Sequence, residues 1–253
     1  MDFSTLECIM FDLDDTLYPG SSGIRECVKK NIETFLVEKC GFSESKAATL
    51  RVEFFKTYGS TLAGLRAHGY DVTHHDYHTF VHGTLPYQHF IKPDTNLRNL
   101  LSTITQRKII FTNSDRNHAV RVLDCLGIKQ CFDQIICFET MNPNLSNHFP
   151  VILKPSLHAF NLALHAADVK DPRRTLFLDD SPRNIAAAKQ MGLQTVVVGM
   201  TVKCNGADYA VENVNQIPQI WTTSDDDDQS SRITLISKSD LDALPITTAT
   251  VGA

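Results

Sequence analysis

Two acidic residues, Asp12 and Asp14, follow a short apolar run near the start of the chain. Side chains on a strand alternate between its two faces, so residues two positions apart point the same way. Two like charges held this close are unfavourable unless a cation or a shared proton relieves them. The pair therefore predicts a metal site, a nucleophile beside an acid, or both, at the carboxyl end of a buried strand.

Three later segments also place polar side chains at strand ends or before a helical pattern: Thr112 with Asn113, Lys154, and the acid pair Asp179 and Asp180. Along the chain the order is acid pair, hydroxyl, lysine, acid pair. This set, in this order, resembles the haloacid dehalogenase-like hydrolase superfamily, and the resemblance covers about residues 8–200.

The resemblance implies a catalytic role for each of these positions. Asp12 would be the nucleophile that accepts the phosphoryl group as an aspartyl phosphate. Asp14 would be the general acid and then the general base, with a pKa that the nearby Asp12 raises. Thr112 and the main-chain N–H of Asn113 would bind the phosphoryl oxygens, and Lys154, at the start of a helix, would neutralise their charge.

The resemblance also implies a magnesium ion. Its ligands would be Asp12, the main-chain carbonyl of Asp14, Asp179 and Asp180. Mg²⁺ prefers oxygen ligands and keeps several waters, so few protein carboxylates suffice. We expect Thr16 and Asn184 to support these ligands without binding the ion themselves.

The elements that must position these residues follow from the hydrophobic pattern. Apolar runs predict strands over residues 8–13, 107–112, 134–138, 175–179 and 195–198. Helical patterns alternate with them, which predicts an α/β fold with a doubly wound parallel sheet and a Rossmann-like core. One such helix is expected from Ser114 or Asp115 to Gly127, and another from Ser181 and Pro182 to Gly192.

More than 90 residues separate the first two predicted strands, too many for one crossover. Helical patterns over 24–40, 43–57, 60–68 and 74–82 predict an inserted α-helical module, and the resemblance implies a small cap of the C1 type. We expect a core of residues 1–20 and 93–221 and a cap of residues 21–92. Residues 222–253, with four consecutive aspartates, predict an acidic, disordered tail.

The substrate prediction rests on the cap. Residues 58–71, 80–87 and 138–143 look like the pyrimidine 5′-nucleotidase-type members of the superfamily and related plant phosphatases of xanthosine monophosphate. The resemblance implies hydrolysis of a nucleoside 5′-monophosphate, either xanthosine monophosphate or UMP/CMP. Candidate contacts to the base are Tyr58, Arg66, His82, Tyr87 and Asn142; the alternative is that aromatic residues here pack the cap itself.

Other functions remain open at this stage. A phosphatase for a sugar phosphate or a lysolipid phosphate would differ only in its cap, and a non-catalytic regulator would act through the acidic tail. A haloacid dehalogenase needs neither Asp14 nor a metal. Six of the ten histidines lie between His68 and His89, but no set of cysteines or acids completes a zinc site there.

Composition narrows the class further. The net charge is −5, with no clustered basic face of the kind that binds nucleic acid. The sequence shows neither an apolar run long enough to span a membrane nor a signal peptide. Seven cysteines without regular spacing predict reduced thiols. We therefore expect a cytoplasmic enzyme whose partner is a small phosphomonoester, with no membrane or nucleic-acid partner.

Overall fold

The computed structural model of the protein describes residues 5–145 and 150–221. Within this part of the chain, six parallel strands form one sheet in the order β3-β2-β1-β4-β5-β6. The strands are β1 (Cys8–Phe11), β2 (Arg107–Phe111), β3 (Gln134–Ile136), β4 (Thr175–Asp179), β5 (Gln194–Val198) and β6 (Tyr209–Val211). The sheet confirms the predicted α/β doubly wound fold.

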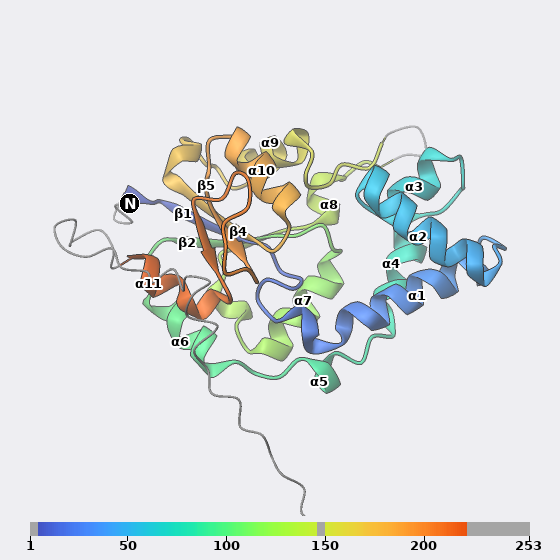
Figure 1. Cartoon of the computed structure of the whole chain (residues 1–253), viewed down its shortest axis with the longest axis horizontal. Coiled ribbons are helices and arrows are strands. Elements are labelled where there is room, and N and C mark those ends of the chain that lie inside the picture. The colour runs from blue at the N-terminus through green and yellow to red at the C-terminus, as the bar shows by residue number, and fades with distance from the viewer. Residues whose placement is uncertain (1–4, 146–149, 222–253) are drawn as a thin grey trace, which may run out of the picture.

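Helices cover both faces of this sheet (Figure 1). They are α6 (Thr95–Thr103), α7 (Arg116–Leu126), α8 (Phe138–Met141), α9 (Leu157–Ala166), α10 (Pro182–Gln190) and α11 (Ile217–Trp221). In β1, Cys8 and Met10 face the core that contains α9 and α10, whereas Ile9 and Phe11 face the core that contains α6 and α7. A strand buried on both faces must be apolar at every position, which explains the unbroken apolar runs.

The long segment between β1 and β2 is helical, as predicted. Its helices are α1 (Ile24–Glu38), α2 (Glu44–Tyr58), α3 (Thr61–Ala67), α4 (His74–Gly83) and α5 (Tyr87–Phe90). Ser43, Ser60 and Thr73 cap α2, α3 and α4, each accepting a hydrogen bond from the backbone N–H three residues on. α1 packs against α2 and α4, and α2 packs against α3. The predicted division into core and cap remains our proposal.

The strands β3 and β6 differ from the sequence prediction, and the core helices α6 and α11 were not predicted. The strand expected over 134–138 ends at Ile136, and Phe138 begins the short helix α8. Phe138 is nevertheless buried. The apolar run therefore predicted correctly which residues are buried, but it did not show where the strand ends. β6 was not predicted, because its three residues are too few to show a periodicity and it forms only by pairing with β5.

The predicted acidic tail lies outside the described residues. No helix in the described part of the chain is long and apolar enough to cross a membrane. All seven cysteines lie within that part and are free thiols, with Cys8 and Cys137 buried.

The packing of α3 on α2 yields a test of the inserted module. A Cβ on Gly64 would lie 2.2 Å from Cγ of Phe54, so we expect Gly64→Ala to lower the free energy of unfolding by about 1–3 kcal/mol. Chemical denaturation measures the change. Gly83→Ala is the matched control, because its Cβ would meet Thr79 at 3.9 Å and should change stability by less than about 0.5 kcal/mol. Equal effects at both positions would contradict this packing.

Candidate active site

The site lies at the carboxyl ends of three adjacent strands. β1 pairs with β2 on one side and with β4 on the other, all parallel, so their carboxyl ends share one edge of the sheet. Asp12 follows β1, Thr112 follows β2, and Asp179 ends β4 with Asp180 after it. The topology therefore gathers the polar residues that the sequence places at strand ends.

Lys154 is the centre of this group. Its Nζ donates hydrogen bonds of 2.7 Å each to Asp12 Oδ1, Asp179 Oδ2 and the main-chain carbonyl of Phe111. The side chain is 1% exposed. Burial alone would lower the pKa of Lys154, but the two carboxylates outweigh it and raise the pKa, so the ammonium stays charged.

The backbone of Lys154 is held as firmly as its side chain. Asn113 Oδ1 accepts from the Lys154 N–H at 2.8 Å, and Asn113 Nδ2 donates to the Lys154 carbonyl at 3.0 Å. The sequence predicted Asn113 as a phosphate ligand through its main chain; the structure adds a structural role for its side chain. Lys154 does not begin a helix as expected, because α9 starts at Leu157 with Ser156 as its cap.

The carboxylates of Asp12, Asp179 and Asp180 offer oxygen atoms that all lie within 4.8 Å of one another. Thr16 donates to Asp12 Oδ2 at 3.0 Å and accepts from the Asp180 N–H at 3.1 Å. Asn184 donates to both oxygens of Asp179, at 2.9 and 3.0 Å. Thr16 thus bonds Asp12 and the backbone of Asp180, and Asn184 bonds Asp179; that they support metal ligands stays a prediction.

The electrostatics of these acids suit a hard divalent cation. Burial raises the pKa of Asp12 well above its ordinary value. The positive charge of Lys154 opposes this shift, and the negative charges of Asp179 and Asp180 add to it. Burial and Asp179 raise the pKa of Asp180 to about 7. Such shifts mean that Lys154 alone does not balance the negative charge. Oxygen ligands and excess negative charge are what Mg²⁺ requires, so these residues fit the predicted ion.

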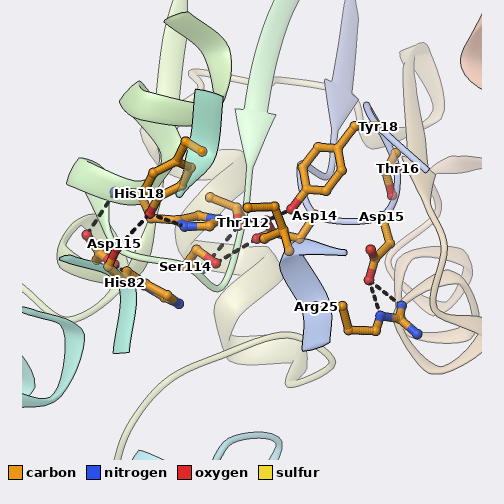
Figure 2. A network of polar contacts seen from close by, with 12 residues as sticks. Asp14, Asp15, Thr16, Tyr18, Arg25, His82, Thr112, Ser114, Asp115 and His118 are labelled. Atoms are coloured by element: carbon orange, nitrogen blue, oxygen red, sulfur yellow. Dashed lines mark hydrogen bonds and ion pairs between the residues drawn. The ribbon is translucent and has the colours of Figure 1, made fainter. Parts of the chain in front are cut away.

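Asp14 is separate from this cluster and faces other partners (Figure 2). Its carboxylate accepts hydrogen bonds from Tyr18 Oη at 2.6 Å, Ser114 Oγ at 2.7 Å and His118 Nε2 at 2.7 Å. Burial alone would raise the pKa of Asp14, but His118 and the two hydroxyls hold it well below its ordinary value. The sequence expectation of a raised pKa is therefore wrong for this arrangement, since proximity to Asp12 is outweighed by these donors.

A second histidine extends the network towards the inserted helices (Figure 2). His82 Nδ1 lies 2.5 Å from Asp115 Oδ2, and the rings of His82 and His118 are 4.4 Å apart. Asp115 also caps α7 by accepting from the His118 N–H at 3.0 Å. A cavity of about 320 Å³ adjoins this network, with His78 and Arg121 also in its lining. His82 on α4 thus joins that helix to the start of α7, through its hydrogen bond with Asp115 and its ring contact with His118.

Arg25 on α1 forms a further link between the inserted helices and the sheet edge. Its guanidinium pairs with Asp15, and its Nη2 lies 3.3 Å from Asp180 Oδ2. Asp15 adopts a left-handed backbone with φ of 61°. The contact with Asp180 places a cationic side chain from α1 against one of the three clustered acids. Figure 2 shows the pairing of Arg25 with Asp15.

Comparison with known proteins agrees with this geometry. The model of the haloacid dehalogenase-like hydrolase family matches residues 6–192, about three quarters of the chain. The chain belongs to the haloacid dehalogenase-like hydrolases. The match covers every predicted motif residue at the sheet edge.

A yeast protein is similar to this hydrolase in sequence. Phosphate metabolism protein 8 of Saccharomyces cerevisiae is 30% identical over 194 residues, which cover 74% of this chain and 60% of the yeast protein. The chain therefore spans less than two thirds of that relative's length.

Solved structures share its fold at identities too low to show more. The HAD phosphatase of Thermococcus onnurineus has a TM-score of 0.58 at 18% identity and covers 85% of this chain and 97% of its own. The HAD hydrolase YfnB of Bacillus subtilis, bound to magnesium, has a TM-score of 0.57 at 16% identity, covering 86% and 99%. The L-2-haloacid dehalogenase of Xanthobacter autotrophicus has a TM-score of 0.54 at 13% identity, covering 87% and 99%.

The predicted substrate contacts of this hydrolase are not all gathered at the site. His82 and Tyr87 join the network around Asp14, and Tyr87 Oη lies 2.8 Å from His118 Nδ1. Asn142 is buried, and its amide already bonds the Ile152 N–H and two backbone carbonyls. We correct that prediction, because every polar atom of the Asn142 side chain serves the loop that follows α8.

Two further candidates lie on the inserted helices. Tyr58, at the end of α2, is 38% exposed and packs against Phe54 and His68. The next residue, Gly59, approaches the active site, since a Cβ there would lie 3.6 Å from the Lys154 carbonyl. Arg66 donates to the Val72 carbonyl at 3.3 Å within the inserted module. Tyr58 is thus placed near the site, whereas the contact of Arg66 is internal to the module.

Thr112 is buried at the end of β2, and its Oγ1 accepts from the Ser114 N–H at 3.0 Å.

The residues that hydrogen-bond to Asp14 were not predicted from the sequence. Tyr18 lies one turn beyond Asp14, and His118 lies three residues after the cap Asp115, so both sit in the first turn after a motif. That spacing is a signal, but only the fold shows that the two turns face each other.

The pair of His82 and Asp115 makes stability depend on pH. Burial would raise the pKa of Asp115, but the hydrogen bond from His82 and its charge hold the pKa below the ordinary 3.8. The ionised carboxylate of Asp115 therefore stabilises the folded state fully above pH 3.8, the ordinary pKa. This stabilisation is lost as pH falls towards the lower pKa of the native state. We expect Asp115→Asn, which keeps the cap, to lower the free energy of unfolding at pH 7 by about 1.5–3 kcal/mol.

Thermal unfolding of both proteins at pH 7, 5 and 3.5 tests this expectation. Burial lowers the pKa of His82, so that imidazole gains its charge as pH falls below 6.5, and the titration of Asp115 is read between pH 5 and 3.5. In that range the difference in Tm should narrow, because the unfolded carboxyl takes up a proton before the native one does. A difference that grows between pH 5 and 3.5 would contradict the assigned direction.

Proposed function

We propose that this hydrolase is a Mg²⁺-dependent phosphatase that cleaves a nucleoside 5′-monophosphate, either xanthosine monophosphate or UMP/CMP, through an aspartyl phosphate. One observation carries the proposal: Lys154 bridges Asp12 and Asp179 at 2.7 Å each, so a cation already holds the nucleophile beside the clustered acids. We propose a cytoplasmic location, in keeping with seven free thiols.

The first step transfers the phosphoryl group to Asp12. A carboxylate oxygen of Asp12 forms a bond to phosphorus while the bond from phosphorus to the ester oxygen breaks. The carboxyl of Asp14 gives its proton to the departing alcohol. Lys154 neutralises charge on the phosphoryl oxygens, and Thr112 with the Asn113 N–H binds them.

The second step releases phosphate. Asp14, now a carboxylate, takes a proton from water as the water oxygen bonds to phosphorus and the bond to Asp12 breaks. The donors around Asp14 lower its pKa and favour the ionised form that the second step needs. The first step therefore requires the negative charge of the bound ester to raise the pKa of Asp14 so that it carries a proton. Asp12, Asp179, Asp180 and the main-chain carbonyl of Asp14 would hold Mg²⁺, which when bound neutralises charge on the phosphoryl oxygens.

A phosphatase accounts for more of the site than a dehalogenase does. Dehalogenation requires no second carboxylate in the first motif and no metal, yet the half-buried Asp14 accepts hydrogen bonds from three donors, and three other acids offer oxygen atoms within 4.8 Å of one another. The name of the yeast relative, Phosphate metabolism protein 8, is consistent with phosphate chemistry.

The nucleotide assignment rests on the inserted helices. The turn between α2 and α3 lies over Lys154, which brings the exposed ring of Tyr58 close to the reaction centre. His82 and Tyr87 border the cavity of about 320 Å³ beside the Asp14 network. Aromatic rings and imidazoles are groups that stack on a base and hydrogen-bond its edge.

Phosphate release from a panel of nucleoside 5′-monophosphates and sugar phosphates tests the proposal. With Mg²⁺ we expect one nucleotide to exceed the others clearly, and EDTA to abolish its hydrolysis. Asp12→Asn removes the nucleophile and should leave less than about one thousandth of the rate. Asp124→Asn, at an exposed position on α7, is the matched control and should keep full activity.

The outcomes separate the parts of the proposal. Equal, slow hydrolysis of all esters would refute the nucleotide assignment and leave the phosphatase. No phosphate release from any ester with Mg²⁺ present would refute the phosphatase.

Asn184 offers a test of the metal site. Its amide orients both oxygens of Asp179, so we expect Asn184→Ala to raise the Mg²⁺ concentration for half-maximal activity about 10- to 100-fold. Titration of activity with Mg²⁺ measures this, and Asn161→Ala, exposed on α9, serves as the control. An unchanged Mg²⁺ requirement would remove Asn184 from this role.

A further inference from the structure

His118 contacts Asp14 from an element far away in sequence. Tyr18 belongs to the same loop as Asp14, four residues on, whereas His118 comes from α7. Its side chain is 1% exposed, in a helix anchored against the sheet. A hydrogen-bond donor fixed to the core orients the Asp14 carboxyl relative to the sheet. A donor on the same loop as Asp14 cannot do this, because it moves together with that loop.

The imidazole of His118 is held at both nitrogens. Nε2 lies 2.7 Å from Asp14 Oδ1, and Nδ1 lies 2.8 Å from Tyr87 Oη. Tyr87 Oη also donates to the His82 carbonyl at 3.1 Å, and the guanidinium of Arg121 lies 4.4 Å from the Tyr87 ring. Nε2 donates to the Asp14 carboxylate. Since Tyr87 Oη gives its one hydrogen to the His82 carbonyl, Nδ1 donates to Tyr87 Oη, and the ring cannot rotate without breaking both bonds.

We propose that His118 is a positioning residue for Asp14: locked by Tyr87, its imidazole holds the carboxyl in the orientation that protonates the leaving alcohol. This inference rests on the proposed phosphatase function and assigns to that function a residue outside its motifs. Tyr87 lies in α5, on the return from the inserted helices to β2. The chain Tyr87–His118–Asp14 therefore connects that return segment to the acid of the first step.

A comparison of two leaving groups isolates this role. An alkyl ester such as a nucleoside 5′-monophosphate needs a proton on its departing oxygen, whereas the 5′-phosphorothiolate of the same nucleoside, with sulfur at the bridging position, departs as a thiolate without one. Both esters carry the same base and ribose, so contacts to the nucleoside affect them alike. Since kcat/KM reports the steps through cleavage of the ester, loss of a positioned acid slows the alkyl ester selectively. Damage to the nucleophile, to the metal site or to the fold slows both esters alike.

Three variants address the two bonds of the imidazole separately. The amide of asparagine in His118→Asn reaches only as far as Nδ1 and loses Asp14. The amide of glutamine in His118→Gln reaches about as far as Nε2 and keeps an N–H for Asp14. Tyr87→Phe removes the hydroxyl that locks the ring without touching Asp14.

We expect His118→Asn to lower kcat/KM for the best nucleotide about 10- to 100-fold and for its 5′-phosphorothiolate less than about threefold. His118→Gln should restore most of the loss, and Tyr87→Phe should show a weaker form of the same selectivity. His165→Asn is the matched control: it lies at the exposed end of α9, away from the cavity, and it should leave both rates unchanged. Thermal unfolding verifies that each variant is folded.

Equal losses for the two esters in His118→Asn would overturn the proposal while leaving the phosphatase intact. If His118→Asn does not fold, Tyr87→Phe decides, and an absence of selectivity there overturns it. A wild-type enzyme that hydrolyses neither ester with Mg²⁺ refutes the proposed function itself, and this inference with it.

Discussion

The ammonium of Lys154, buried between Asp12 and Asp179, is the interaction on which the edge of the sheet depends. Removing one partner of such a buried pair leaves an uncompensated charge and typically costs about 3–5 kcal/mol. The surroundings serve this balance. Asn113 holds the Lys154 backbone from both sides, and the rings of Phe111 and Phe177 lie 4.9 and 5.3 Å from its Nζ.

Two carboxylates of one short motif experience opposite environments. Asp12 meets other acids and burial, which raise its pKa, whereas Asp14 meets an imidazole and two hydroxyls, which lower it. Their roles therefore follow from their neighbours rather than from their spacing. The negative charge of the acids around Asp12 favours a bound cation. The negative charge of Asp14 is balanced by its hydrogen-bond donors and needs no cation.

Much of the fold and of the acid cluster was predictable from sequence, because strands buried on both faces leave unbroken apolar runs and parallel strands bring their ends together. The location of Asp12, Asp179 and Asp180 follows from that rule, whereas Lys154 follows no strand and was placed at the site by the family resemblance. The network around Asp14 does not, since it requires two turns from different segments to meet. Asn142 was misread because a buried amide bonded to backbone looks, in sequence, like one available to a ligand.

The contact of Arg25 with Asp180 ties the first inserted helix to one of the carboxylates that would receive a divalent ion. Two positive groups compete for the negative charge of one carboxylate. Binding of an ion at Asp180 and the ion pair of Arg25 with that residue are therefore thermodynamically linked: a change that removes the guanidinium strengthens ion binding, and a bound ion weakens the ion pair by the same factor. The position of α1 and the charge at the edge of the sheet are thus coupled through Asp180.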